Sequence, residues 1–256
     1  MKFLAFDTST DVMSIAVTDG IRVWQHTGPG GAKSSATLIP AILALLAEAQ
    51  LALGALDAIV FGRGPGSFTG LRTACSVAQG LALGAGVKVL PIDTLMALAE
   101  EARFTHTVGP LAGEPLRITA LLDARMDEMY VQSYNFSHGT CVKTSDCRLI
   151  RPENLLADVS ADIISTALLA GNVFSVYADR LPADLARFTC APVLPTATAL
   201  LRLAPALAAA GQCVDAALAL PLYVRDKVAL TTEERDQVKL AKARAAEASA
   251  AEVPVN

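Results

Sequence analysis

A glycine-rich stretch at residues 61–72, FGRGPGSFTGLR, is the part of this sequence whose residue types and spacing come nearest to those of a ligand-binding site. Glycines that open a helix let backbone N–H groups hold a phosphate. The stretch does not match a P-loop, because Leu71 and Arg72 stand where Lys and then Ser or Thr are required, and its glycines do not fit G-x-G-x-x-G in any register. A phosphate cradle is one interpretation. We favour a structural turn that positions Arg63, Phe68 and Arg72 for a protein partner.

The polar run Asp7, Thr8, Ser9 and Thr10 follows a short apolar segment and is the second candidate site. It resembles the first phosphate loop of the actin-like and sugar-kinase ATPases, which usually has glycine where Ser9 stands. That resemblance implies residues close to a nucleotide. A turn in which Asp, Ser and Thr side chains bond to nearby backbone groups explains the run equally well. The run therefore predicts a nucleotide-proximal loop or a structural turn, and we favour the turn.

Asp123 and Asp127 flank Arg125 and form the third candidate site. Two carboxylates at this spacing could hold a metal ion or exchange protons. We favour a salt-bridged turn, because no histidine lies nearby in the sequence. The three histidines of the chain are scattered and none pairs at i, i+4, so no metal site is predicted. The G-x-S-x-G pattern is absent as well, and no catalytic residue is predicted.

The composition excludes several broad classes of protein. The chain has 256 residues, of which 53% are apolar, and a net charge of −4. Such a chain can bury a large core, but it is too acidic to bind RNA broadly through its own field, so RNA contact is expected only through a partner. Five cysteines without a C-x-x-C pair indicate reduced thiols and a cytoplasmic protein. Neither a signal peptide nor a membrane span is predicted.

The hydrophobic pattern predicts an α/β protein in which two similar three-stranded meanders each begin a sheet. Asp19-Gly20, between two β-rich runs, is the strongest hairpin signal. Strands are predicted at residues 2–6, 12–18, 21–26, 56–61, 87–92, 116–122, 128–136, 140–150 and 163–170. Helices are predicted at residues 34–50, from 70 onward, at 94–103 and at 196–210.

Two of these helices are expected to form a partner interface. The helix at residues 34–50 is apolar around most of its circumference and needs cover on two sides, so we expect Leu38, Ile42 and Leu45 to contact a partner. The helix after the glycine-rich stretch carries a stripe of small residues, which lets another helix approach closely. The stripe consists of Thr73, Ser76, Gly80 and Gly84. Packing against the protein's own sheet is an equally good interpretation of the stripe.

Four segments, at residues 4–10, 62–72, 123–130 and 221–225, together resemble the bacterial TsaB family, also called YeaZ, of the tRNA threonylcarbamoyladenosine pathway. The resemblance covers most of the chain. It implies an actin-like, ribonuclease-H-like α/β fold of two lobes, each with a mixed sheet flanked by helices. It also implies a non-catalytic subunit that binds and activates TsaD in threonylcarbamoyl transfer to adenosine 37 of tRNA.

The resemblance extends to partners and cofactors. It implies a heterodimer with TsaD, TsaE as a third component, a homodimer when the protein is alone, and contact with tRNA only through the complex. No cofactor is intrinsic, and ATP or ADP is expected only in the assembled complex. The rival classes are an ATP-dependent phosphotransferase of the sugar-kinase type and a peptidase.

The first lobe is expected at residues 1–104 with 196–230, the second at 105–195, and a flexible charged tail at 231–256.

Overall fold

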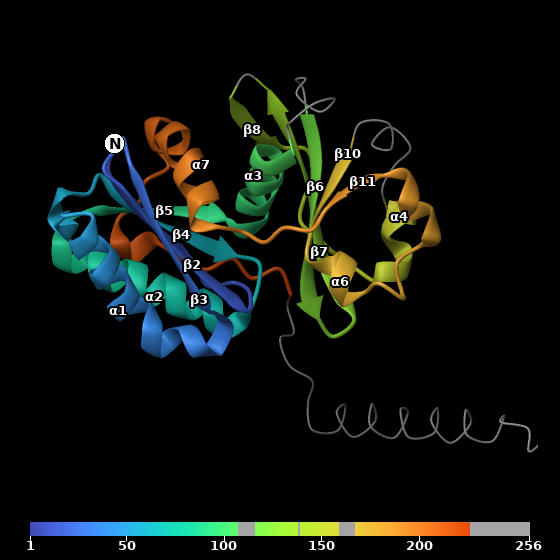
Figure 1. Cartoon of the computed structure of the whole chain (residues 1–256), viewed down its shortest axis with the longest axis horizontal. Coiled ribbons are helices and arrows are strands. Elements are labelled where there is room, and N and C mark those ends of the chain that lie inside the picture. Colours follow the sequence, from blue (N-terminus) through green and yellow to red (C-terminus); the bar gives the residue numbers. More distant parts are fainter. Residues whose placement is uncertain (107–115, 138, 159–166, 226–256) are drawn as a thin grey trace, which may run out of the picture. The chain divides into compact units, whose positions relative to one another are not determined.

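The first of two mixed sheets leads into the polar turn at the end of β1 and into the glycine-rich stretch at the end of β4. The computed structural model describes residues 1–106, 116–137, 139–158 and 167–225 (Figure 1). The sheet has the strand order β3-β2-β1-β4-β5. Its strands are β1 (Phe3–Asp7), β2 (Val12–Thr18), β3 (Val23–Pro29), β4 (Ala58–Gly64) and β5 (Lys88–Asp93). The first three strands form the predicted antiparallel meander, whereas β4 runs parallel to β1 and β5 parallel to β4.

The second sheet repeats this plan with a meander followed by parallel strands. Its strands are β6 (Leu116–Arg125), β7 (Glu128–Ser137), β8 (Thr140–Lys143), β9 (Arg148–Ile150), β10 (Ala167–Gly171) and β11 (Thr189–Ala191). Their order is β11-β10-β6-β7-β8, and β9 also pairs with β7. The antiparallel pairs involve β7, while β10 runs parallel to both β6 and β11. Two mixed sheets were predicted, and the structure confirms them.

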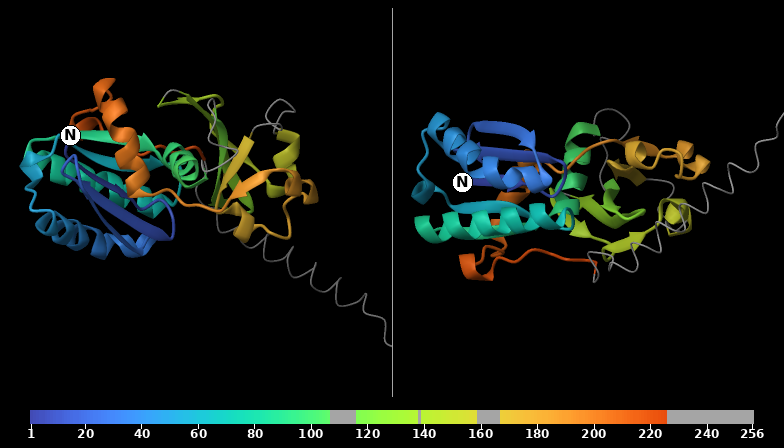
Figure 2. Two further views of the ribbon diagram at one scale, coloured as in Figure 1. Left: turned by 45° about the horizontal axis from the view of Figure 1, so that its top comes forward. Right: turned by 90° about the horizontal axis from the view of Figure 1, so that it is seen from below.

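Helices cover both faces of the first sheet. The long helices are α1 (Ser34–Glu48), α2 (Phe68–Ala85), α3 (Thr94–His106) and α7 (Ala197–Ala209), and the short ones are α4 (Leu155–Asp158) and α6 (Val173–Val176). Helices α1 and α2 lie side by side on one face, and α3 and α7 lie on the other (Figures 1 and 2). Successive residues of a strand point to opposite faces. Accordingly Leu4 and Phe6 of β1 pack with α1 and α2, whereas Phe3 and Ala5 pack with α3 and α7.

One hydrophobic core is shared by the two sheets. It contains Val60 and Leu90 of the first sheet together with Ile118 and Tyr134 of the second, and α3 contributes a run of buried residues, Leu95–Ala99, to it. Residues Met1–Val224 accordingly form one compact unit. No helix within the described ranges is long and apolar enough to cross a membrane.

Several element boundaries differ from the prediction. Strand β4 continues through Gly62 to Gly64, where the glycine-rich turn was expected to begin. The strand predicted at residues 140–150 is two strands, β8 and β9; between them the Ser145 Oγ accepts a hydrogen bond from the backbone N–H of Ser133 at 2.9 Å. The first part of the strand predicted at 163–170, and the predicted tail, lie outside the described residues.

Candidate partner-binding surface

Helix α2 begins within the glycine-rich stretch, at Phe68. Ser67 is its N-cap, and the Ser67 side chain accepts a hydrogen bond from the backbone N–H of Gly70. Gly86, in the left-handed region at φ +69°, ends the helix as its C-cap. The buried residues of α2 recur every three or four positions and face the sheet. They are Gly70, Leu71, Ala74, Cys75, Ala78 and Ala82.

The opposite side of α2 is open. Ser76, Gly80 and Gly84 are exposed and Thr73 is half-buried. A Cβ atom placed on Gly80 or Gly84 would meet no other atom within 4 Å. The stripe of small residues therefore does not pack against the protein's own sheet, and that interpretation is wrong. The stripe presents a shallow, nearly flat surface on which another helix could lie.

Helix α1 contributes different residues to this surface from those predicted. Leu38 and Ile42 are 0% exposed and Leu45 is 5% exposed, so their side chains are buried in the core against the first sheet. The expectation that these three contact a partner directly is therefore corrected. Their spacing places them on one face of the helix, and that face packs against the sheet. The exposed large apolar residues of α1 are Ile39 and Leu43.

An aromatic and cationic cluster lies at the N-terminal end of α2. The Arg72 guanidinium lies 3.8 Å from the centre of the Phe68 ring, and Arg72 Nε donates to the Tyr223 hydroxyl at 3.1 Å. The Phe68 and Tyr223 rings are 5.5 Å apart. Aromatic and arginine side chains held in place in this way are typical anchors of protein interfaces. The cluster supports the prediction that Phe68 and Arg72 face a partner.

Arg63 is bound within the chain. Its Nε lies 2.6 Å from Oδ1 of Asp93, a residue that is 4% exposed, and Lys143 of the second sheet also forms an ion pair with Asp93. The Arg63 side chain is only 36% exposed. Its guanidinium therefore forms an internal ion pair near the junction of the two sheets. Less of the side chain is accessible to a partner than the prediction assumed.

The polar run at residues 7–10 forms a buried, internally bonded turn. The Asp7 side chain is 1% exposed, and its Oδ1 accepts hydrogen bonds from the Ser9 backbone N–H at 2.8 Å and the Ser9 hydroxyl at 2.5 Å. The Thr94 hydroxyl donates to Oδ2 at 3.3 Å. Burial away from water raises the pKa of Asp7, and the hydrogen bonds from Ser9 and Thr94 oppose that rise.

The glycine-rich stretch covers this turn with its own backbone. Ser67 N donates to Ser9 O at 2.7 Å, and the Thr8 hydroxyl donates to Gly70 O at 2.7 Å. A Cβ on Gly62 would overlap the Asp7 carboxylate, and one on Gly70 would overlap the Thr8 carbonyl. Close backbone packing explains these glycines without a phosphate. The nucleotide-proximal expectation for Asp7, Thr8, Ser9 and Thr10 finds no support in this geometry.

The turn between β6 and β7 is salt-bridged, as we favoured. Arg125 Nη1 lies 3.3 Å from Asp123 Oδ2, and Asp127 pairs with Arg180 at 2.7 Å. The Tyr177 hydroxyl donates to Asp123 Oδ1 at 2.6 Å. Both carboxylates are thus engaged by cations or a hydroxyl of this chain. Among the described residues, no group of three or more His, Cys, Asp or Glu side chains is placed to hold a metal ion.

Sequence reasoning missed the exposed apolar residues of the surface. Because an α-helix has 3.6 residues per turn, Ile39 and Leu43 lie about 100° around α1 from Leu38 and Ile42, and this angle was a usable signal. Helical spacing likewise places Leu83 of α2, which is 80% exposed, next to the small stripe. The contact of Tyr223 with the first turn of α2 carried no such signal, because only the folded chain brings the two segments together.

Comparisons with known proteins find one matching family model and several similar proteins. The family model for TsaD, tRNA N6-adenosine threonylcarbamoyltransferase, matches residues 26–209. The tRNA threonylcarbamoyladenosine biosynthesis protein TsaB of Escherichia coli is 27% identical over 230 residues, which are 90% of this chain and 96% of that protein. TsaB of Haemophilus influenzae is 38% identical over 130 residues, which are 51% of this chain and 52% of that protein.

A solved structure agrees with these sequence matches. YeaZ from Pseudomonas aeruginosa superposes on this chain with a TM-score of 0.75 and 36% sequence identity, covering 87% of this chain and 99% of that one. This likeness and the TsaD match confirm the predicted actin-like fold of two lobes. The chain belongs to the TsaB family, also called YeaZ, of tRNA threonylcarbamoyladenosine biosynthesis proteins.

Proposed function

We propose that this chain is a non-catalytic subunit that binds and activates TsaD in threonylcarbamoyl transfer to adenosine 37 of tRNA. The observation that carries the proposal is the open stripe of α2, a helix face that the protein's own core leaves uncovered. The TsaB relatives support it by name, and the match to the TsaD model supports a partner of related fold. A complex that modifies tRNA would act in the cytoplasm.

The proposed interface is the outer face of α1 and α2. A partner of related fold would offer an equivalent helix pair, and two such pairs can form a four-helix bundle about a pseudo-two-fold axis. Thr73, Ser76, Gly80 and Gly84 would allow close approach. The exposed apolar residues of the same two helices, which the partner would bury, are Ile39, Leu43 and Leu83.

The remaining predicted residues take supporting roles in the proposal. Phe68 and Arg72, braced by Tyr223, would anchor one end of the interface. Leu38, Ile42 and Leu45 would hold α1 in place from beneath. When TsaD is absent, a second copy of this chain would cover the same surface, because an exposed apolar surface is a liability in water.

The proposal gives the chain no nucleotide chemistry of its own. The side chains of the turn at residues 7–10 are bonded within the chain. In the proposal, ATP or ADP and TsaE act only in the assembled complex, and tRNA is bound through that complex. Isothermal titration of the isolated chain with ATP and Mg²⁺ should show no saturable heat. Saturable binding accompanied by phosphate release would favour the phosphotransferase alternative.

A reconstituted reaction tests the proposed function. Cognate TsaD, TsaE and TsaC are incubated with tRNA, threonine, bicarbonate and ATP, with or without this chain, and the modified nucleoside is quantified by mass spectrometry. We expect the complete mixture to modify tRNA, and the chain alone to form no product. Equal product formation without the chain would refute the proposal, as would modification by the chain alone.

A further inference from the structure

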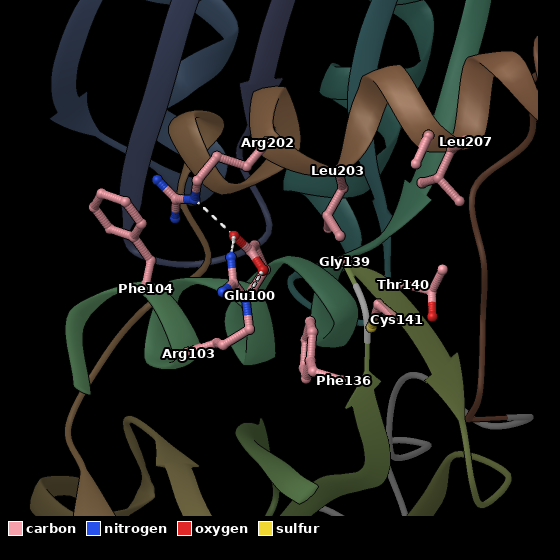
Figure 3. A pocket seen from close by; sticks show the side chains of 11 residues that line it. Glu100, Arg103, Phe104, Phe136, Gly139, Thr140, Cys141, Arg202, Leu203 and Leu207 are labelled. Carbon is pink, nitrogen blue, oxygen red and sulfur yellow. Dashed lines mark hydrogen bonds and ion pairs between the residues drawn. The ribbon is translucent and has the colours of Figure 1, made fainter. Parts of the chain in front are cut away.

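A pocket far from the α1–α2 surface lies where helices α3 and α7 meet the β7–β8 hairpin (Figure 3). Its volume is about 360 Å³, near the lower end of the range of small-molecule sites. The lining residues come from both lobes: Glu100, Arg103 and Phe104 from α3, Arg202, Leu203, Ala206 and Leu207 from α7, and Phe136, Gly139, Thr140 and Cys141 from the hairpin. The pocket is concave and sized for a small ligand.

The charged groups that face the pocket are mainly cationic. Arg103 and Arg202 line it together with one carboxylate, that of Glu100. Glu100 is buried, with its side chain 3% exposed, whereas the Arg103 and Arg202 side chains are 34% and 23% exposed. A ligand that entered would therefore meet guanidinium groups before it met the carboxylate.

Both guanidinium groups are fixed before any ligand arrives. Glu100 accepts from Arg103 Nε at 2.7 Å and Nη2 at 2.9 Å, and from Arg202 Nε at 2.8 Å. Glu101, which does not line this pocket, accepts from Arg202 Nη2 at 2.5 Å, and the Phe104 ring lies 4.1 Å from the Arg202 guanidinium. Side chains already held in one geometry lose little further entropy when they bind a ligand.

The rest of the lining is apolar or uncharged. Figure 3 shows Leu203 and Leu207 directed from α7 toward the side of the pocket formed by Phe136 and the hairpin. Burial raises the pKa of the Cys141 thiol to about 12, so this group adds no negative charge near neutral pH. The pocket thus combines an arginine pair with an apolar wall.

We propose that this pocket binds a small amphiphilic anion, a molecule with one carboxylate or phosphate group and a compact apolar body. The anionic group would bind the exposed part of the Arg202 guanidinium, since guanidinium groups suit both carboxylate and phosphate geometry. The apolar body would lie against Leu203 and Leu207. Because the ligand would touch α3, α7 and the hairpin at once, its binding would stabilise the junction between the lobes.

Phenyl phosphate and benzoate are suitable probes, and benzylamine is the matched cation. Each is titrated into the ¹⁵N-labelled full chain, and amide shifts are followed. We expect saturable shifts of Thr140, Cys141 and Ala206 with the two anions and none with benzylamine. A preference between the anions distinguishes phosphate from carboxylate ligands, and inorganic phosphate should bind more weakly because it lacks the apolar body. Equal responses to anion and cation, or no saturation with either anion, would overturn the proposal.

Two tryptophan variants localise the site. Ala206 and Ala209 are both exposed on α7, but only Ala206 lines the pocket. Ala206→Trp should fill the pocket and abolish the shifts with phenyl phosphate, while Ala209→Trp should retain them. Arg202→Gln should weaken binding by about tenfold or more. If that variant proves unstable, the two tryptophan variants still test whether the ligand binds in this pocket. Wild-type affinity in Ala206→Trp would refute the assignment.

Discussion

Two buried carboxylates near the polar turn show how neighbouring groups set the behaviour of single residues. Asp7 is 1% exposed and is bonded only to hydroxyl and N–H groups, whereas Asp93 is 4% exposed and pairs with two cations, Arg63 and Lys143. When a carboxylate is buried without a cation nearby, desolvation mainly destabilises its charged form. For Asp7 that cost exceeds the gain from its hydrogen bonds, and its pKa is raised.

The raised pKa of Asp7 predicts how stability depends on pH. Below the ordinary carboxyl pKa of 3.8, the folded and unfolded states both hold the proton. As the pH rises, the unfolded state releases it first, so the folding free energy that Asp7 contributes is lost progressively through the raised folded pKa. Asp7→Asn keeps the acceptor for Ser9 and has no proton to release. Its stability should therefore improve relative to wild type as the pH rises.

Urea unfolding of wild type and Asp7→Asn at a series of pH values measures this difference. The variant should also retain the modified-tRNA yield of the reconstituted reaction, because Asp7 has no catalytic role in the proposal. If wild type instead gained stability over Asp7→Asn with rising pH, the hydrogen bonds to the carboxylate would outweigh its burial cost and the assigned cause would be incorrect.

At the scale of elements, α1 and α2 have different inner and outer faces, and the outer faces form the proposed interface. The inner face of each helix packs on the first sheet, with residues such as Ile42 and Ala78 fully buried. The outer face combines the small stripe of α2 with the exposed Leu43 and Leu83. A helix whose inner face is packed and whose outer face is exposed can bind a partner through that outer face.

The open stripe predicts opposite effects of one substitution on folding and on assembly. Gly80→Leu places its side chain in open space and replaces glycine in a helix interior, so the monomer should gain up to about 1 kcal/mol of stability. The same side chain would block the close approach of a partner helix, so TsaD binding should be lost. Thermal melts and size-exclusion chromatography measure the two effects.

Ala209→Leu is the matched control for Gly80→Leu. It adds a leucine to an exposed position of α7, on the other side of the first sheet, and should leave TsaD binding unchanged. A loss of stability of about 1–3 kcal/mol in Gly80→Leu, the usual cost of overpacking, would mean that the stripe packs internally.

At the scale of the whole molecule, one core joins the two lobes. Helix α3 packs against strands of both sheets, and the shared core includes Leu90 from one sheet and Tyr134 from the other. We therefore expect residues Met1–Val224 to unfold in a single cooperative transition. Fluorescence of Trp24, the sole tryptophan, reports on the first sheet, whereas the tyrosine bands of near-ultraviolet circular dichroism include Tyr130 and Tyr134 of β7 in the second. Separate midpoints for the two signals would show that the lobes fold independently.

The shared-surface proposal predicts that self-association and TsaD binding exclude each other. Adding TsaD should convert a homodimer of this chain into a one-to-one complex, followed by light scattering after chromatography. Leu83→Glu, at a position 80% exposed, should block both associations without unfolding the chain. Substituting Leu45 could not test this, because Leu45 is buried in the core.

Ile21→Glu is the control for Leu83→Glu. Ile21 is 93% exposed but lies in the turn between β2 and β3, outside α1 and α2. It should leave both associations intact. If Leu83→Glu abolished the homodimer but left TsaD binding and tRNA modification unchanged, the two associations would use different surfaces.

The sequence by itself determined the family and the long helices, but not where strands β8 and β9 separate. The short apolar run at residues 3–6 and the helical spacing of Leu71, Ala74, Cys75 and Ala78 reflect local geometry, so strand β1 and helix α2 were predictable. Spacing also showed that the glycine-rich stretch is not a P-loop. Such features depend only on residues that are close together in the sequence.

Only the tertiary structure decided which helix faces are covered. The apolar circumference of α1 did not say that Leu38, Ile42 and Leu45 face the sheet, and the stripe on α2 suited internal and external packing equally. The pairing of Asp93 with Arg63 and Lys143, and the contact of Tyr223 with Arg72, join residues far apart in the chain. Burial and long-range contacts depend on how elements pack together, and a local pattern of residue types does not specify that packing.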